Sequence, residues 1–203
     1  NMLTLNGQKM AKSTGNNILP SEILSGNTTQ LSKGFSPSVV RFFMMQAHYR
    51  SILDLSNDAL LASEKGFLKL MDALKTLANL TPSNTATNFD VSSWKQRCYD
   101  AMNDDFNTPI LISEIFSAVK YINQIKDGSS SIDAENLKTL KATLNGFVFE
   151  VLALQENTNS NSDKKLRETI EILIALRNQA RDQKNFGLSD KIRDQLAEIE
   201  IQL

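Results

Sequence analysis

From Asp54 onward, apolar residues recur at steps of three and four, and the alternation typical of strands is absent. This spacing places apolar side chains on one face of a helix, and such faces are buried by packing against one another. The sequence contains five such stripes: Leu60, Phe67, Met71, Leu74 and Ala78; Ile112, Ile115, Val119 and Ile122; Leu137, Leu140, Leu144, Phe147 and Val151; Leu166, Ile170, Leu173, Leu176 and Ala180; Leu188, Ile192, Leu196 and Ile199. The pattern predicts an all-α fold, an antiparallel bundle of five or six long helices.

Capping residues mark where several of these helices begin. Ser36-Pro37 and Thr108-Pro109 each combine an N-cap hydroxyl with a proline at the first helical position, where its missing N–H costs nothing. Three aspartates occupy other predicted cap positions: Asp90, Asp133 and Asp163.

Residues 1–20 depart from the helical pattern. Residues 3–5 read as a short strand that ends at the turn pair Asn6-Gly7, and a lysine-rich loop follows as far as Pro20. One short strand cannot form a sheet, so we expect its partners in another chain or in sequence outside this one. We therefore expect residues 1–20 to be mobile or ordered only by such contacts, and the chain to be the C-terminal piece of a larger protein.

Composition excludes several classes of protein. A single cysteine, Cys98, rules out a disulfide framework, and with a single histidine, His48, it leaves too few ligands for most metal sites. We expect Cys98 and His48 to be packing residues, and we expect no metal site in this chain. No apolar run approaches the roughly 18–20 residues that span a bilayer. We therefore expect a cytoplasmic protein that binds neither membranes nor DNA.

The net charge is −1, but it is unevenly distributed. Residues 1–50 hold five basic side chains and one acidic one, and residues 163–194 hold eight basic and six acidic ones. A polyanion contact is therefore expected near the start or near the end of the chain.

The stretch Lys9-Met10-Ala11-Lys12-Ser13 is the main candidate for chemistry. Two lysines three positions apart, with hydroxyls and a glycine close behind, can place two ammonium groups around a phosphate chain. Such a loop would stabilise charge on a leaving pyrophosphate while staying mobile enough to open and close. The alternative is an exposed polar loop without chemistry, and composition alone favours that alternative.

The same stretch resembles the Lys-Met-Ser-Lys-Ser signature of class I aminoacyl-tRNA synthetases, with Ala11 in place of the middle serine. The resemblance implies that Lys12 is catalytic and contacts the ATP phosphates during amino-acid activation. It also implies that Lys9, Met10 and Ser13 help to bind ATP. The alanine removes one hydroxyl and neither charge.

Three further segments resemble cysteinyl-tRNA synthetases: residues 40–51, residues 101–109 and residues 181–194. The second is similar to a Met-Asp-Asp-Asp-Phe-Asn-Thr-Pro stretch, with Asn103 in place of the first aspartate. Read from the residues alone, Asp104 and Asp105 are helix-start carboxylates that favour the helix dipole, rather than a metal or acid–base pair. With the loop, the three segments are spread from about residue 3 to about residue 200, which is nearly the whole length of the chain.

This family resemblance implies a part of an enzyme that activates cysteine with ATP and Mg and transfers it to tRNA(Cys). It implies a loop of the catalytic domain at 1–19, a connecting helical region at 20–53, and a helical tRNA- and anticodon-binding domain at 54–203. Zinc is expected only in the catalytic domain outside this chain. The residues that it places near the anticodon are Arg177, Arg181, Lys184, Lys191 and Arg193.

Three other interpretations remain open. One is a relative that joins cysteine to an amino sugar in mycothiol synthesis, which would not need the anticodon-facing helices. Another is a non-enzymatic helical interaction module whose loop resembles the signature by chance. The third is a different class I synthetase, which the segments around His48 and Asn107-Thr108-Pro109 disfavour.

Overall fold

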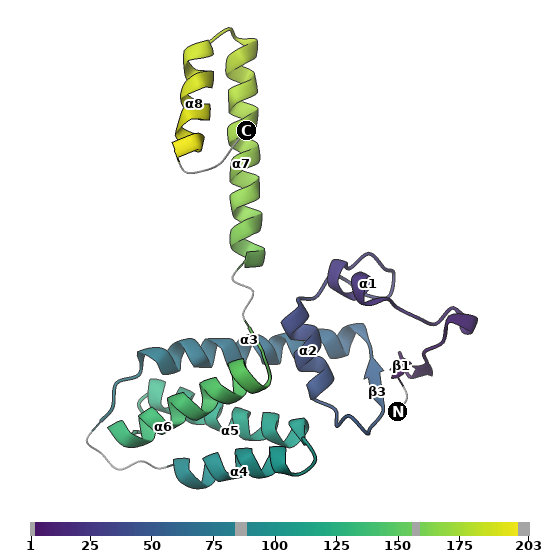
Figure 1. Cartoon of the computed structure of the whole chain (residues 1–203), viewed down its shortest axis with the longest axis vertical. Coiled ribbons are helices and arrows are strands. Elements are labelled where there is room, and N and C mark those ends of the chain that lie inside the picture. Colours follow the sequence, from purple (N-terminus) through teal and green to yellow (C-terminus); the bar gives the residue numbers. More distant parts are fainter. Residues whose placement is uncertain (1–2, 84–88, 156–158, 199–203) are drawn as a thin grey trace. The chain divides into compact units, whose positions relative to one another are not determined.

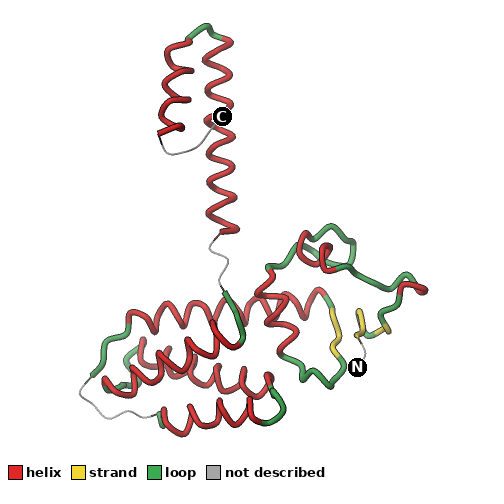
Figure 2. Tube along the Cα trace, in the orientation of Figure 1, coloured by secondary structure: helices red, strands yellow, loops and turns green. Residues whose placement is uncertain are grey.

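The apolar stripes do form helices in the computed structural model of the chain, which describes residues 3–83, 89–155 and 159–198 and so leaves Ile199 of the fifth stripe outside the description. The chain divides into two compact units, residues 1–156 and residues 157–203. Most described residues are helical, and the only strands among them lie in the first unit (Figures 1 and 2). The predicted all-α class is confirmed, with the addition of one small sheet.

The sheet has three strands in the order β2-β1-β3. Their bounds are Leu3–Leu5 for β1, Gln8–Lys9 for β2 and Leu53–Leu55 for β3. β1 runs antiparallel to β2, and parallel to β3 with Leu5 opposite Leu55. The expectation that the strand's partners lie outside the chain is therefore wrong. β3 escapes a search for alternation because it has only three residues and pairs with a segment almost fifty positions away.

Residues 1–20 are also tied to the first unit by burial. Leu5 is 1% exposed and Ile18 is 7% exposed, and both belong to its hydrophobic core. The expectation that residues 1–20 are ordered only by other molecules is wrong for this reason.

The described residues of the first unit also form six α-helices: α1 (Pro20–Ser25), α2 (Pro37–Met45), α3 (Asn57–Asn79), α4 (Val91–Asn103), α5 (Thr108–Lys126) and α6 (Ala134–Asn145). Three predicted caps are confirmed. The Ser36 hydroxyl accepts a hydrogen bond from the N–H of Val39 at 3.3 Å. Asp90 and Asp133 cap α4 and α6 in the same way, each at 2.9 Å.

Two predicted caps are wrong. Asn107 is the N-cap of α5, and Thr108 is already helical. The Thr108 hydroxyl instead donates to the carbonyl of Met45 at 2.8 Å, so it joins the start of α5 to the end of α2. The other is Asp163, which lies inside α7 (Asn159–Asp182) rather than before it.

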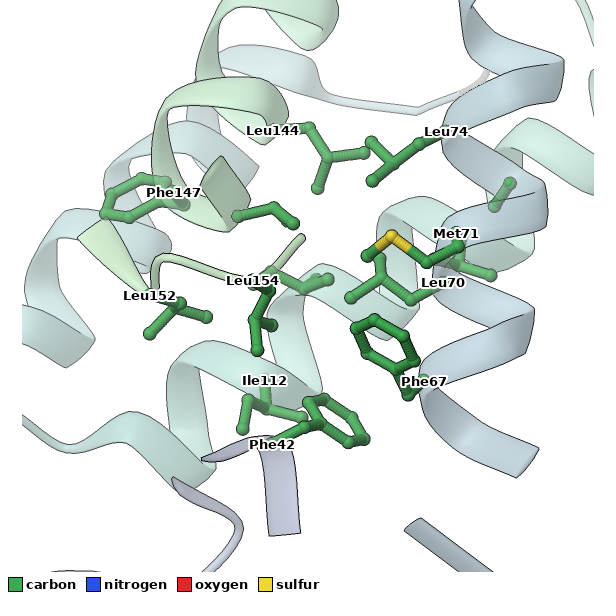
Figure 3. Packing of buried hydrophobic residues seen from close by; sticks show 14 of the residues in the cluster. Phe42, Phe67, Leu70, Met71, Leu74, Ile112, Leu144, Phe147, Leu152 and Leu154 are labelled. Atoms are coloured by element: carbon green, nitrogen blue, oxygen red, sulfur yellow. The ribbon is translucent and has the colours of Figure 1, made fainter. Parts of the chain in front are cut away.

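The core of the first unit is built from the predicted faces. Leu70 and Met71 of α3, Ile112 of α5 and Leu144 of α6 point toward one another, with Phe42 of α2 nearby (Figure 3). All four residues of the α5 stripe are buried. Trp94 of α4 is fully buried, and its indole N–H donates to the carbonyl of Glu114 at 2.8 Å.

The third stripe ends differently from the prediction, because α6 continues into a π-helical segment, η2 (Gly146–Val151). The N–H of Leu152 donates to the carbonyl five residues back, at Phe147, at 2.8 Å. This wider turn rotates the following residues, so Val151 is exposed while Leu152 and Leu154 are buried. The first stripe also loses its last residue, because Ala78 is exposed.

The second unit contains a helical hairpin of α7 and α8 (Phe186–Glu198). Ala180, Ser189 and Leu196 are buried where the two helices pack. Leu176 and Leu188 were predicted to be core residues, but both are about half exposed. Two helices cover only one face of each other, so a wide apolar stripe keeps an uncovered edge.

Candidate functional site

The lysine loop is an exposed extension of the hairpin formed by β1 and β2. Lys9 ends β2, and Lys12 begins a single 3₁₀ turn, η1 (Lys12–Thr14). The side chains of Lys9, Lys12 and Ser13 are exposed, whereas Met10 is half-buried and packs against the core. Two lysines and a hydroxyl are thus exposed to solvent on a short loop, and Met10 anchors this loop to the core.

The loop is closed by backbone contacts of its own. The N–H of Ala11 donates to the carbonyl of Asn16 at 2.9 Å, which makes an isolated antiparallel bridge across the loop. Gly15 ends η1 with a left-handed φ of 69°, a conformation that glycine adopts without steric cost. The first acidic residue of the sequence is Glu22, so the loop carries two positive charges and no negative ones. Such a loop can stabilise negative charge that develops on a phosphate chain.

Asp54 of β3 holds the β1–β2 turn in place through hydrogen bonds to its carboxylate. Its carboxylate accepts the Thr4 hydroxyl at 2.6 Å and the N–H of Gly7 at 2.8 Å. The Thr4 hydrogen bond, followed by that of Gly7, lowers the pKa of Asp54 below its ordinary value. Asp54 therefore stays ionised and connects the base of the loop to the segment that enters α3. The sequence gives no indication of this role of Asp54, because its partners are some fifty positions away.

A second polar cluster joins the end of α2 to the connection between α4 and α5. The Tyr49 hydroxyl donates to Asp105 at 2.8 Å, and the Arg50 guanidinium lies 3.0 Å from the other oxygen of the same carboxylate. Asp105 and Phe106 both have a positive φ, and the Phe106 side chain is 67% exposed. Asp105 thus acts as an ion-pair partner of the α2 end, a role that its predicted position at a helix start does not convey.

His48 lies beside this cluster and has a structural role, as expected. Its ring packs on that of Tyr49 at an angle of 31°, with centroids 4.7 Å apart, and its Nδ1 accepts the N–H of Arg50 at 3.3 Å. These contacts are those of a packing residue with one satisfied ring nitrogen, which is the role predicted for His48.

The five basic residues predicted to contact tRNA all lie in the α7–α8 hairpin, in different surroundings. Arg181 of α7 and Lys191 of α8 are exposed. Lys184 is exposed in the turn between the helices, with a φ of 56°. It therefore does not share one face of α7 with Arg177 and Arg181, although the three residues follow one another at steps of four and three. Arg177 is half-buried, and its buried Nε has no hydrogen-bond partner among the described residues. Arg193 forms ion pairs with two aspartates, Asp190 and Asp194.

Cys98 is fully buried on α4, as predicted for a core residue. Burial, followed by the nearby Glu114 carboxylate, raises the pKa of the Cys98 thiol to about 12. The described residues contain no group of three or more metal-ligating side chains. No helix in the described part of the chain is long and apolar enough to cross a membrane.

We expect the Cys98 thiol to resist Ellman's reagent at pH 8 and to react only at the rate of unfolding, because the thiolate is absent from the native state. Its pKa is higher in the folded chain than in the unfolded one. Its contribution to stability is therefore complete below the unfolded value near 8.5 and is lost as the pH rises toward 12. Labelling in urea gives the fully reactive control, and immediate labelling of the native chain would contradict the assignment.

Comparisons with protein families place the lysine loop and the helical bundle in two known domains. Residues 1–65 match the family model described as the class I (C) tRNA synthetase catalytic domain, and residues 97–156 match the DALR domain model. The first match extends beyond the loop, through β3 and into α3.

The similar curated proteins carry the name cysteine–tRNA ligase. Those of Bacteroides fragilis and Parabacteroides distasonis are 43% and 40% identical over 198 residues, which is 97% of this chain and 40% of each relative. That of Chlorobaculum tepidum is 36% identical over 209 residues, which is 100% of this chain and 41% of the relative. The chain thus spans about 40% of the length of these relatives. Their names confirm the predicted resemblance and do not favour a mycothiol-type ligase or a non-enzymatic module.

Proposed function

Since this chain is homologous over nearly its whole length to part of the cysteinyl-tRNA synthetases, we propose that it serves the same reaction in a longer enzyme. That enzyme activates cysteine with ATP and transfers the cysteinyl group to tRNA(Cys). The observation that carries the proposal is the exposed Lys9–Ser13 loop, which lies within the catalytic-domain match and has the lysine spacing that phosphate binding requires.

Lys12 stabilises the negative charge that develops on the leaving pyrophosphate, and Lys9, Met10 and Ser13 support ATP with its Mg. Zinc, where the enzyme uses it, is bound by other parts of the protein, since the lone cysteine here is buried on α4. The cytoplasm is the proposed location, because protein synthesis takes place there.

The helical region at 54–203 serves tRNA binding, the loop at 1–19 belongs to the catalytic domain, and the helical region at 20–53 connects the two. Residues 157–203 form a compact unit of their own, so the α7–α8 hairpin is a distinct part of this region. Its exposed Arg181, Lys184 and Lys191 offer cations for phosphates, and Phe186 is 60% exposed and available to stack on a base.

We expect Arg181→Ala and Lys184→Ala to impair aminoacylation of tRNA while leaving cysteine activation intact, because each variant removes one phosphate contact. Each should lower the slope of log binding constant against log salt concentration by about one. Arg193→Ala should change charging and the salt slope less than either variant, because the charge of Arg193 is already partly balanced by Asp190 and Asp194. Filter binding of tRNA at a series of salt concentrations, beside pyrophosphate exchange, makes the measurement.

Normal charging and an unchanged salt slope in both variants would mean that Arg181 and Lys184 are ordinary solvated residues that do not contact tRNA. Loss of cysteine activation in either variant would also contradict the proposal, because it would mean that the hairpin acts on the first step.

A further inference from the structure

We propose that Asn16 is the positioning residue of the lysine loop, whose side-chain amide holds the neck of the loop and so keeps Lys9 and Lys12 at a working separation. The inference rests on the proposed function and extends it to a residue outside the Lys9–Ser13 signature.

At the neck of the loop, where β1 and β2 end, three backbone carbonyl oxygens lie around one side-chain nitrogen. Nδ2 of Asn16 lies 3.2 Å from the carbonyl oxygen of Lys9, 3.3 Å from that of Gln8 and 3.4 Å from that of Leu5. These carbonyls belong to the end of β1 and to both residues of β2. The backbone carbonyl of Asn16 also accepts the N–H of Ala11 at 2.9 Å. One residue therefore joins the strand that enters the hairpin, the strand that leaves it and the far end of the loop.

Beyond this neck the loop is held only by short-range contacts. The N–H of Gly15 bonds to the carbonyl of Lys12, and the N–H and hydroxyl of Thr14 both bond to the carbonyl of Ala11. These bonds give the turn its shape but do not attach it to the sheet. The attachment comes from Met10, which packs on the core, and from Asn16, which is half-buried. Lys12 stands between these two attachments, so its position depends on both.

The chemistry of the site calls for an amide. Three carbonyl oxygens face the same nitrogen, and an amide NH₂ group offers them two hydrogens without a charge. A carboxylate of the same shape would place a negative oxygen against three carbonyl oxygens. Alanine would remove the brace without adding repulsion. If Asn16 only filled space, aspartate would be the mildest replacement; if it donates hydrogen bonds, aspartate is worse than alanine.

The test compares Asn16→Asp, Asn16→Ala and Asn17→Asp in the full-length enzyme by cysteine-dependent ATP–pyrophosphate exchange. Asn17 is the matched control, since it places the same charge one residue further on, where the side chain makes none of these contacts. We expect kcat to fall about 10- to 100-fold in Asn16→Asp and less in Asn16→Ala, as misplacement of a catalytic group predicts. The KM for cysteine and the rate of Asn17→Asp should stay near those of the unaltered enzyme.

A double variant shows whether Asn16 acts through Lys12. Asn16→Asp should slow the Lys12→Ala enzyme much less than it slows the unaltered enzyme, because a lysine that is absent cannot be misplaced and only the placement of Lys9 remains to be affected. Full additivity of the two effects would overturn the proposed role. So would an Asn16→Asp enzyme that is as active as Asn17→Asp.

Hydrogen exchange of the same variants separates this inference from the proposed function. The amides of Met10 and Ala11 bond to the carbonyls of Leu3 and Asn16, and they should exchange at least tenfold faster in Asn16→Asp than in Asn17→Asp. Equal exchange would overturn the bracing role whatever the activities are. Suppose that Lys12→Ala left the rate of cysteine activation unchanged while the Met10 and Ala11 amides exchanged faster in Asn16→Asp. The bracing role of Asn16 would then be supported, and the proposed role of the loop in activation would be contradicted.

Discussion

Replacing Lys12 with alanine should slow cysteine activation by the full-length enzyme about 30- to 1,000-fold, which corresponds to roughly 2–4 kcal/mol of lost transition-state stabilisation. Lys12 is exposed at the start of η1, in a loop with two cations and no anion, so its charge is free to meet a phosphate chain. Pyrophosphate exchange measures this step alone. The KM for cysteine should change little, because the lysine serves the phosphates rather than the amino acid.

Lys120→Ala is the control for this experiment, because Lys120 is an exposed lysine of α5, far along the chain from the loop. Its activation rate should stay within twofold or so of the unaltered enzyme. If Lys12→Ala kept the normal activation rate while only tRNA charging fell, Lys12 would belong to tRNA binding and not to catalysis.

Trp94→Ala should destabilise the chain by about 3–5 kcal/mol, the largest stability effect that we expect of any single substitution. The indole is fully buried among the helices of the first unit, and its removal leaves a cavity and removes the hydrogen bond that its N–H donates to the carbonyl of Glu114 at 2.8 Å. Urea denaturation followed by circular dichroism at 222 nm reports the loss as a lower midpoint with an unchanged slope.

Two further variants test the mechanism of that loss. Trp94→Phe keeps most of the volume and loses the hydrogen bond, so it should cost clearly less than Trp94→Ala. Leu68→Ala removes a side chain that is 52% exposed on α3 and should stay within about 0.5 kcal/mol of the unaltered chain. Equal costs for Trp94→Ala and Leu68→Ala would contradict the packing described here.

The helical class, the lysine loop and the family resemblance were all readable from the sequence, because each depends on residues close together in the chain. The α5 stripe is buried in full, since a regular helix repeats the same face every three or four residues. The two lysines and the hydroxyl of the loop are exposed, as their polarity predicts.

The errors share a different cause, which is that long-range contacts override local pattern. Val151 follows the period of an α-helix in the sequence but is exposed, because it lies at the end of a π-helical segment whose wider turn shifts the buried face. Thr108 has the chemistry of a cap, yet its hydroxyl bonds to the end of α2. The short strand β1 seemed to lack a partner because β3 has only three residues, too few for an alternation of apolar and polar positions to be recognised in the sequence.

The spacing of apolar and charged residues was therefore enough to establish a helical protein with a cationic loop near its start. What braces that loop was decided by tertiary structure alone. Asp54 reaches the β1–β2 turn from a strand that lies next to it only after folding, and the three carbonyls around Asn16 converge only when the hairpin closes. A hydrogen bond depends on distance in space, and the chain sets that distance only after β1, β2 and β3 have paired.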